Sequence, residues 1–156
     1  MPDELEIAYV AVVGPGDGAA AAVLDVAEEV GARLASRGAV VVCGGLGGIM
    51  AAACHGAREA GGTTLGLLPG SDRSAANAWV SIAVATGLGE LRNGLVIRAA
   101  DAVIAVGGGY GTLSEIAFAL KAGKAVVGLG GWEIPGVLVA SDPAAAVALA
   151  LDRPRG

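Results

Sequence analysis

Short, almost wholly apolar runs alternate along this chain with stretches whose apolar residues recur at helical spacing. The first run, residues 7–13, ends at a glycine-rich turn, and helical spacing then continues from Ala19 to about Arg37. Further strands are expected at 39–43, 63–68, 80–85, 102–106, 125–129 and 137–140, and further helices at 49–60, 90–99 and 143–151, with one more ending at 122. Uninterrupted apolar strands separated by helices are typical of parallel sheets buried on both faces. The sequence therefore predicts an α/β fold, a three-layer, Rossmann-like parallel sheet of about six to seven strands with helices on both faces.

Length and composition fit one globular domain spanning residues 1–156. Hydrophobic residues make up 54% and charged residues 16% of the chain, which argues against disorder. Aromatic residues make up only 3%, so alanine, valine, leucine and isoleucine must fill the core. The alanine-rich helix surfaces carry few charges, and we expect a homo-oligomer, a dimer or tetramer, with residues 49–60 and 91–99 as candidate contacts.

Charge and polarity patterns argue against several functional classes. The net charge is −5 and no run of lysines and arginines occurs, so a nucleic-acid partner is not expected. An acidic N-terminus and the absence of an apolar stretch of roughly 20 residues predict a cytoplasmic protein without a membrane segment. Cys43 and Cys54 are expected to be buried free thiols. His55, the only histidine, is expected on a helix surface, so no metal site is predicted.

Six loops follow predicted strands and should share the carboxyl edge of the sheet, where open α/β sheets bind ligands. In the first loop, Gly14 and Gly16 could belong to a dinucleotide fingerprint, but the second strand lacks the acidic residue that would hold a ribose. An anion loop and a simple tight turn both stay open there. In the second loop, Gly44, Gly45 and Gly48 fit either close packing or ligand binding, and the run of glycines before a helix favours binding.

The most informative stretch is residues 103–115, an apolar strand followed by four glycines in five positions and then a helix. Gly108, Gly109, Gly111 and Thr112 could turn backbone N–H groups toward a phosphate at a helix N-terminus. The spacing is not that of a Walker loop, because no Lys-Ser/Thr pair follows. Thr112 and Glu115 also fit a capping box, and this alternative stays open.

Arg92 begins a predicted helix directly after a carboxyl-edge turn, so it should point toward the same edge as Glu115. The two side chains could form a structural salt bridge. Alternatively, the guanidinium could bind a phosphate or ribose while the carboxylate acts on water or on developing positive charge.

Together, Gly44-Gly45-x-x-Gly48-Ile49-Met50, Arg92 and the motif Gly107-Gly108-Gly109-Tyr110-Gly111-Thr112-x-x-Glu115 resemble the LOG family, the lysine decarboxylase-like Rossmannoid proteins with a Pro-Gly-Gly-x-Gly-Thr-x-x-Glu signature. The resemblance implies a phosphoribohydrolase that cleaves the N-glycosidic bond of AMP or a cytokinin riboside monophosphate, with Arg92 and Glu115 as catalytic residues and phosphate on the 107–112 turn.

The chain departs from that signature in two places. Gly107 replaces the proline, and Asn93 follows Arg92 where LOG enzymes usually have lysine. Residues 86–92 and 117–121, the short length and the Gly14-Pro15-Gly16 loop are closer to a small sister branch that includes the molybdenum cofactor carrier proteins. That resemblance implies binding of a phosphorylated pterin, the molybdenum cofactor, without chemistry. Both readings imply a phosphorylated, nucleotide-like small molecule as the partner, and neither requires another cofactor.

Overall fold

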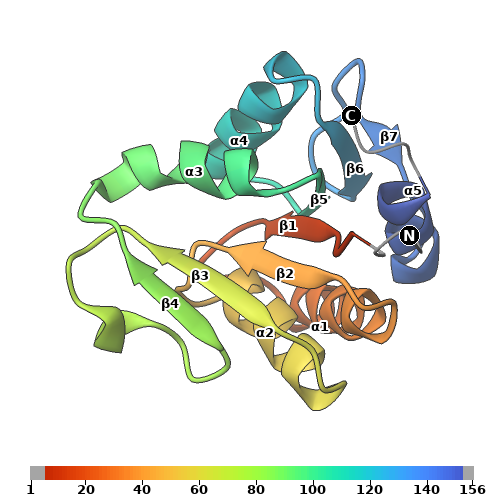
Figure 1. Ribbon diagram of the computed structural model, residues 1–156. Coiled ribbons are helices and arrows are strands. Elements are labelled where there is room, and N and C mark those ends of the chain that lie inside the picture. Colours follow the sequence, from red (N-terminus) through yellow and green to blue (C-terminus); the bar gives the residue numbers. More distant parts are fainter. Residues whose placement is uncertain (1–5, 153–156) are drawn as a thin grey trace, which may run out of the picture.

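The computed structural model describes residues 6–152, which form one seven-stranded parallel sheet with five α-helices (Figure 1). The strands are β1 (Tyr9–Val13), β2 (Val40–Cys43), β3 (Thr64–Leu68), β4 (Ile82–Ala85), β5 (Ala102–Val106), β6 (Ala125–Leu129) and β7 (Leu138–Val139). The helices are α1 (Ala21–Ser36), α2 (Ile49–Glu59), α3 (Arg92–Ala99), α4 (Tyr110–Lys121) and α5 (Pro143–Leu151). The strand order is β4-β3-β2-β1-β5-β6-β7. The predicted fold class is confirmed.

Helices cover both faces of the sheet because alternate residues of each strand point to opposite sides. Val10 and Val12 of β1 belong to the apolar cluster shared with α1, α2 and α5. Ala11 and Val13 belong to the cluster shared with α3 and α4. The central strand is therefore buried on both faces, as its uninterrupted apolar sequence predicts.

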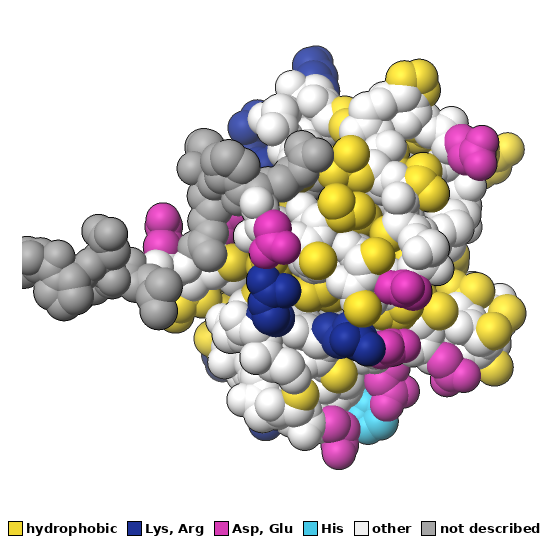
Figure 2. Space-filling model, turned by 90° about the vertical axis from the view of Figure 1, so that its right-hand side faces the viewer, with side chains coloured by type: hydrophobic (Ala, Val, Ile, Leu, Met, Phe, Trp, Pro, Cys, Tyr) yellow, Lys and Arg dark blue, Asp and Glu magenta, His cyan; other side chains and the backbone are white. Residues whose placement is uncertain are grey.

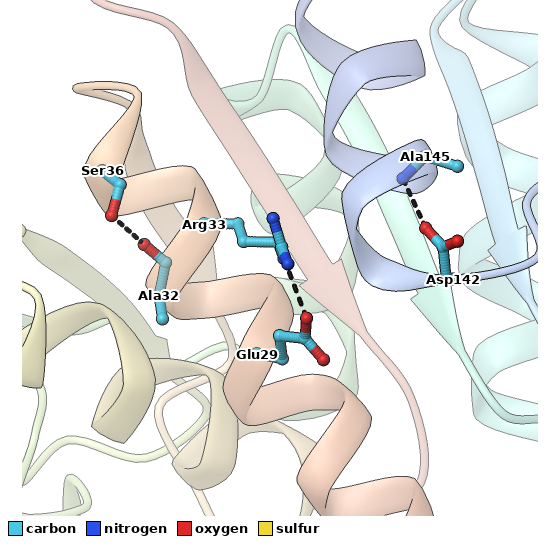
Figure 3. A network of polar contacts seen from close by, with 6 residues as sticks. All are labelled: Glu29, Ala32, Arg33, Ser36, Asp142 and Ala145. Carbon is cyan, nitrogen blue, oxygen red and sulfur yellow. Dashed lines mark hydrogen bonds and ion pairs between the residues drawn. The ribbon is translucent and has the colours of Figure 1, made fainter.

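Helices α1 and α2 lie side by side (Figure 1), at a separation that small residues make possible. A Cβ atom at Gly31 would lie 1.9 Å from the carbonyl oxygen of Ala53, and one at Gly56 would lie 1.9 Å from that of Glu28. The exposed side of α1 carries an ion pair of 2.9 Å between Arg33 and Glu29 (Figure 3). Gly31 and Gly56 therefore allow the two helices to approach closely where they face each other, and the ion pair of α1 lies on its solvent side.

The sheet has one topological switch point, between β1 and β5. The chain adds β2, β3 and β4 on one side of β1 and then crosses to place β5 on the other side. The turns after β1 and β5 consequently leave neighbouring strands toward opposite layers, the arrangement at which open α/β sheets usually bind ligands. Within residues 6–152, no helix is both long and apolar enough to cross a bilayer.

Candidate functional site

Four of the loops predicted to share the carboxyl edge contact one another through glycines. A Cβ at Gly14, after β1, would lie 2.4 Å from the carbonyl oxygen of Val106, and one at Gly48, after β2, would lie 1.7 Å from that of Gly16. A Cβ at Gly131, after β6, would lie 2.1 Å from the carbonyl oxygen of Gly107. The backbones of these loops therefore approach more closely than any side chain would allow.

Three of the four glycines in the β2 loop, residues 44–48, lie close to other parts of the structure. Gly44 and Gly45 are buried. A Cβ at Gly44 would lie 2.6 Å from Nη2 of Arg92, and one at Gly45 would lie 2.8 Å from Leu68. Gly48 has φ +64°, a left-handed conformation that favours glycine. Their predicted role in ligand binding stays a prediction.

Hydrogen bonds from Asn77 and a contact between two cysteines stabilise the position of the β2 loop. Asn77 donates from Nδ2 to the carbonyl oxygen of Leu46 at 2.9 Å, and its backbone N–H donates to that of Gly45 at 2.9 Å. At the base of the loop, the Sγ atoms of Cys43 and Cys54 lie 3.4 Å apart. The hydrogen bond to Cys54, together with burial, holds the pKa of the Cys43 thiol well above its ordinary value. Both cysteines are free and buried, as predicted.

The β5 loop, residues 107–111, leads into α4 and has more open space around its glycines than the β2 loop has. A Cβ at Gly111 would have no neighbour within 4 Å, and one at Gly109 would reach only Oγ1 of Thr112, at 4.0 Å. Gly16, in the adjacent β1 loop, is equally open. Gly108 faces the ring of Trp132, at 3.4 Å from a Cβ position. This part of the edge can therefore admit a ligand to the backbone.

Helix α4 begins three residues earlier than a capping box of Thr112 and Glu115 would require. Its N-cap residue is Gly109, no side chain caps it, and Thr112 is buried within the first turn. The capping-box alternative is therefore wrong, because Thr112 is not at the helix boundary. The first-turn N–H groups of Tyr110, Gly111 and Thr112 have no acceptor within the helix.

Helix α5 offers a contrast within the same chain. There the Asp142 carboxylate accepts a hydrogen bond of 2.8 Å from the N–H of Ala145 (Figure 3). Helix α1, whose N-terminus also lies at the switch point, has Ala20 at its N-cap and, like α4, no side-chain cap. The two helices that begin at the switch point thus both have positive N-termini without a side-chain cap.

Gly107 shows why this chain can depart from the proline of the LOG signature. Its φ is +75°, whereas a proline ring fixes φ near −65°. Its N–H also donates to the carbonyl oxygen of Leu129 at 3.0 Å, a bond that proline cannot make. The backbone at this position therefore requires a residue with an N–H group and a left-handed conformation.

Arg92 and Glu115 lie on the neighbouring helices α3 and α4. Nη2 of Arg92 donates to the carbonyl oxygen of Gly44 at 3.4 Å, and Nη1 donates to Oδ1 of Asn93. Its Nε is buried without a hydrogen-bond partner among the described residues. No salt bridge joins Arg92 to Glu115 in residues 6–152, so the structural ion-pair alternative does not hold.

Glu115 lines a cleft of about 480 Å³ between α3 and α4, together with Asn93, Tyr110, Gly111 and Phe118. Burial raises the pKa of the Glu115 carboxyl to about 7, although the positive charge of Arg92 acts in the opposite direction. This carboxyl is therefore close to half-ionised at neutral pH and can exchange a proton there.

His55 lies on the α2 surface, away from these residues. Its ring nitrogens are 3.3 Å from Glu28 and 3.6 Å from Glu59, and Figure 2 shows the histidine beside acidic side chains. Among the residues described, no group of three or more His, Cys, Asp or Glu side chains could hold a metal ion.

Sequence reasoning missed two residues at the edge. Trp132, in the loop after β6, donates from Nε1 to the carbonyl oxygen of Gly109 at 2.9 Å. Tyr110, inside the glycine motif, is 85% exposed and lies near the Trp132 ring. A large aromatic residue in a carboxyl-edge loop was the available signal for Trp132.

The fold defines a Rossmann-like α/β protein whose glycine-rich loops meet at the carboxyl edge of the sheet. Residues 7–152 match the SLOG cluster4 family, and the chain belongs to this family. It is similar to the solved structure of the molybdenum cofactor binding protein from Rippkaea orientalis, with a TM-score of 0.88 and 35% identity over 93% of this chain and 96% of that chain.

Two further proteins are similar to this chain. The molybdenum cofactor carrier protein of Chlamydomonas reinhardtii has a TM-score of 0.84 and 36% identity over 94% of this chain and 99% of that chain. An uncharacterised protein from Archaeoglobus fulgidus is 45% identical over 104 residues, which are 67% of this chain and 68% of that protein. The predicted likeness to the LOG-like proteins, and to the branch with molybdenum cofactor carriers, is confirmed.

Proposed function

We propose that this protein binds a phosphorylated small molecule at the turn between β5 and α4, and that it carries molybdenum cofactor or a related pterin. The observation that carries the proposal is the uncapped first turn of α4 at the topological switch point, where Gly109 and Gly111 leave open space. Free N–H groups at the positive end of a helix dipole favour a phosphate.

The negative net charge of the chain means that an anionic ligand must be bound by nearby groups and not by the overall charge of the protein. The net charge is −5, so a phosphorylated ligand gains nothing from the protein as a whole. Its binding must come from short-range donors, namely the amides of the α4 turn, with Arg92 of α3 as the nearby cation. The buried, unpaired Nε of Arg92 is a donor that a ligand or a bound water could satisfy.

The similar proteins support the ligand class. The Rippkaea orientalis and Chlamydomonas reinhardtii proteins are named for molybdenum cofactor binding and carriage, and both match this chain along more than nine-tenths of its length. Since the identities are 35% and 36%, we extend the named ligand to this chain as a proposal.

Binding can be tested with the purified protein and two matched variants. Gly111→Asp adds a carboxylate in the open space beside the α4 turn, and Gly111→Asn adds an uncharged group of the same size. We expect wild type to retain molybdenum cofactor, measured as a fluorescent oxidised pterin per chain. Gly111→Asp should lose at least about tenfold more affinity than Gly111→Asn. Equal retention by the two variants would overturn a phosphate site at this turn.

A second candidate is a phosphoribohydrolase, favoured by the raised pKa of Glu115 in the cleft beside Arg92. In that reaction water adds to the anomeric carbon of the ribose, the N-glycosidic bond breaks, and a proton passes to the leaving base. Glu115 would orient the water or stabilise positive charge on the ribose.

The hydrolase candidate is tested by incubating the protein with AMP and measuring free adenine. If the enzyme is active, Glu115→Gln should abolish turnover, by about 100-fold or more, and leave AMP affinity within about threefold. Adenine release by Glu115→Gln at the wild-type rate would remove Glu115 from the reaction. If wild type binds the cofactor but releases no adenine from AMP, only the carrier function remains supported.

The predicted homo-oligomer also belongs to this proposal. Of the two segments expected at subunit contacts, residues 91–99 expose Leu91, directly before α3, and Leu95 within α3, with 78% and 40% of their surfaces accessible. Leu91→Glu should lower the molecular mass measured by light scattering, whereas Val139→Glu, at an exposed residue of β7, should not. A monomeric wild type would contradict the oligomer.

A further inference from the structure

Tyr110 and Trp132, here called the aromatic pair, lie directly at the uncapped turn of α4. Their ring centroids are 6.2 Å apart and the ring planes are inclined by 32°. Tyr110 is 85% exposed and Trp132 is 37% exposed. Core packing therefore does not account for the position of Tyr110, whose side chain is largely in solvent.

Few aromatic side chains are available elsewhere in this chain. It has only five: Tyr9, Trp79, Tyr110, Phe118 and Trp132. Trp79 packs against the His55 ring at 4.6 Å, and Phe118 lies under the guanidinium of Arg98 at 5.4 Å. Two of the five are therefore placed together at the one turn where a phosphate is proposed to bind.

Trp132 is held rigidly at this position. Its indole N–H donates to the carbonyl oxygen of Gly109, at 2.9 Å. Its loop is fixed to the β5 loop, because Gly131 has φ +78° and a Cβ there would lie 2.1 Å from the carbonyl oxygen of Gly107. A Cβ at Gly108 would lie 3.4 Å from the indole ring, so the absence of a side chain lets the ring approach the backbone. One ring is thus preorganised beside the proposed phosphate position.

Tyr110 connects this ring to the Glu115 cleft. It is the first residue of α4, so its backbone N–H belongs to the turn, and its side chain also lines the cleft between α3 and α4. A ligand with its phosphate on the turn would have its remaining part within reach of this ring.

We propose that the aromatic pair stacks against a planar, conjugated heterocycle, such as a purine or pterin ring, carried by the phosphorylated ligand. The inference rests on the proposed phosphate site and adds what selects the rest of the ligand. Stacking requires only a flat π-surface, so the pair discriminates ringed from ringless phosphates and tolerates different ring substituents.

The test compares three phosphorylated probes, namely AMP, a pterin phosphate monoester and ribose 5-phosphate, by calorimetry at fixed salt. In wild type, at least one ringed probe should bind about tenfold more tightly than ribose 5-phosphate. Tyr110→Ala should remove about tenfold of that affinity and leave the affinity for ribose 5-phosphate unchanged. Tyr110→Phe, which keeps the ring, should behave as wild type.

Failure of this inference is distinguishable from failure of the phosphate site. If none of the three probes binds, the proposed function is overturned. If all three bind with equal affinity, or if Tyr110→Ala weakens ringed and ringless probes alike, only the stacking role is overturned.

Fluorescence supplies a second readout for the same pair. In a Trp79→Phe background, Trp132 is the only indole in the chain. Its emission should be quenched when a ringed probe binds and should not change with ribose 5-phosphate. Quenching by both kinds of probe would contradict stacking on Trp132.

Discussion

The β2 loop and the β5 loop have nearly the same sequence pattern and opposite structural character. Each places four glycines within five residues between an apolar strand and a helix. In the β2 loop, a Cβ at Gly44, Gly45 or Gly48 would lie under 3.0 Å from another atom, and at Gly48 those atoms belong to the backbone. In the β5 loop, Gly109 and Gly111 face open space. The same residue type thus brings backbones together in one loop and leaves a helix turn accessible in the other.

The difference teaches that a glycine-rich loop is not by itself a ligand loop. Glycine removes a side chain, but the space gained can be filled by another part of the protein. At the carboxyl edge, the β2 loop packs against the β1 loop, and its Gly44 carbonyl oxygen accepts a hydrogen bond from Arg92. The β5 loop instead leads into the first turn of α4, whose backbone N–H groups have no side-chain cap. One loop therefore shapes the site, and the other is the better candidate to contact a ligand.

The largest expected effect tests the packing role of the β2 loop. Gly48→Ala would place a methyl group 1.7 Å from the carbonyl oxygen of Gly16 in a left-handed conformation. We expect it to lower the free energy of unfolding by about 3 kcal/mol or more, or to prevent folding. Gly47→Ala, whose Cβ would lie 3.8 Å from its nearest neighbour, should cost less than about 1 kcal/mol in urea denaturation. Similar losses for both variants would refute the distinction.

An intermediate effect concerns Glu115, which lies on the helix after the β5 loop. Its pKa is about 7 in the folded protein, against an ordinary value of 4.5. Between these values the native state binds more protons, so stability should fall as pH rises from about 4.5 to about 7. Glu115→Gln should remove this dependence and be more stable than wild type at pH 8 by about 1–2 kcal/mol, less than the full shift implies because the side chain is only partly buried.

The control for this pH dependence is Glu90→Gln, at an exposed residue of the same cleft. It should keep the wild-type decrease in stability between the two pH values. If Glu115→Gln and wild type follow the same stability profile from pH 4 to pH 8, the Glu115 carboxyl does not titrate near 7.

The sequence predicts the layered fold well because its signal is local. Strands β1 to β6 are mostly apolar runs of four or five residues. Gly38 and Gly123 follow the ends of helices with φ near +77°, the usual position for glycine there. The start of α4 was less predictable, because its N-cap is a glycine, which has no capping side chain to identify. In addition, Thr112-x-x-Glu115 matches the sequence pattern of a capping box without forming one. The local sequence pattern therefore predicts which helices and strands form, but it can place the start of a helix wrongly.

The roles of the site residues depend on contacts that sequence spacing does not reveal. Gly48 contacts Gly16, 32 positions earlier, and Trp132, in the loop after β6, contacts Gly109 in the loop after the neighbouring strand β5. Arg92 and Glu115 were expected at one edge from topology alone, and the structure places them on adjacent helices. What separates an enclosed glycine from an open one is the identity of its neighbours after folding, which a single sequence does not provide.

The smallest effect tests the open character of the β5 loop. Gly111 lies in the first turn of α4, and a Cβ there would meet no atom within 4 Å. Gly111→Ala should therefore stabilise the protein, by about 0.5 kcal/mol, because alanine loses less backbone freedom than glycine in a helix. The same methyl group should weaken binding of inorganic phosphate if the turn receives it. Stability and phosphate affinity would then change in opposite directions, which urea denaturation and calorimetry can measure on one variant. A loss of stability comparable to that of Gly48→Ala would mean that Gly111 is also required by packing, and the contrast between the two loops would no longer hold.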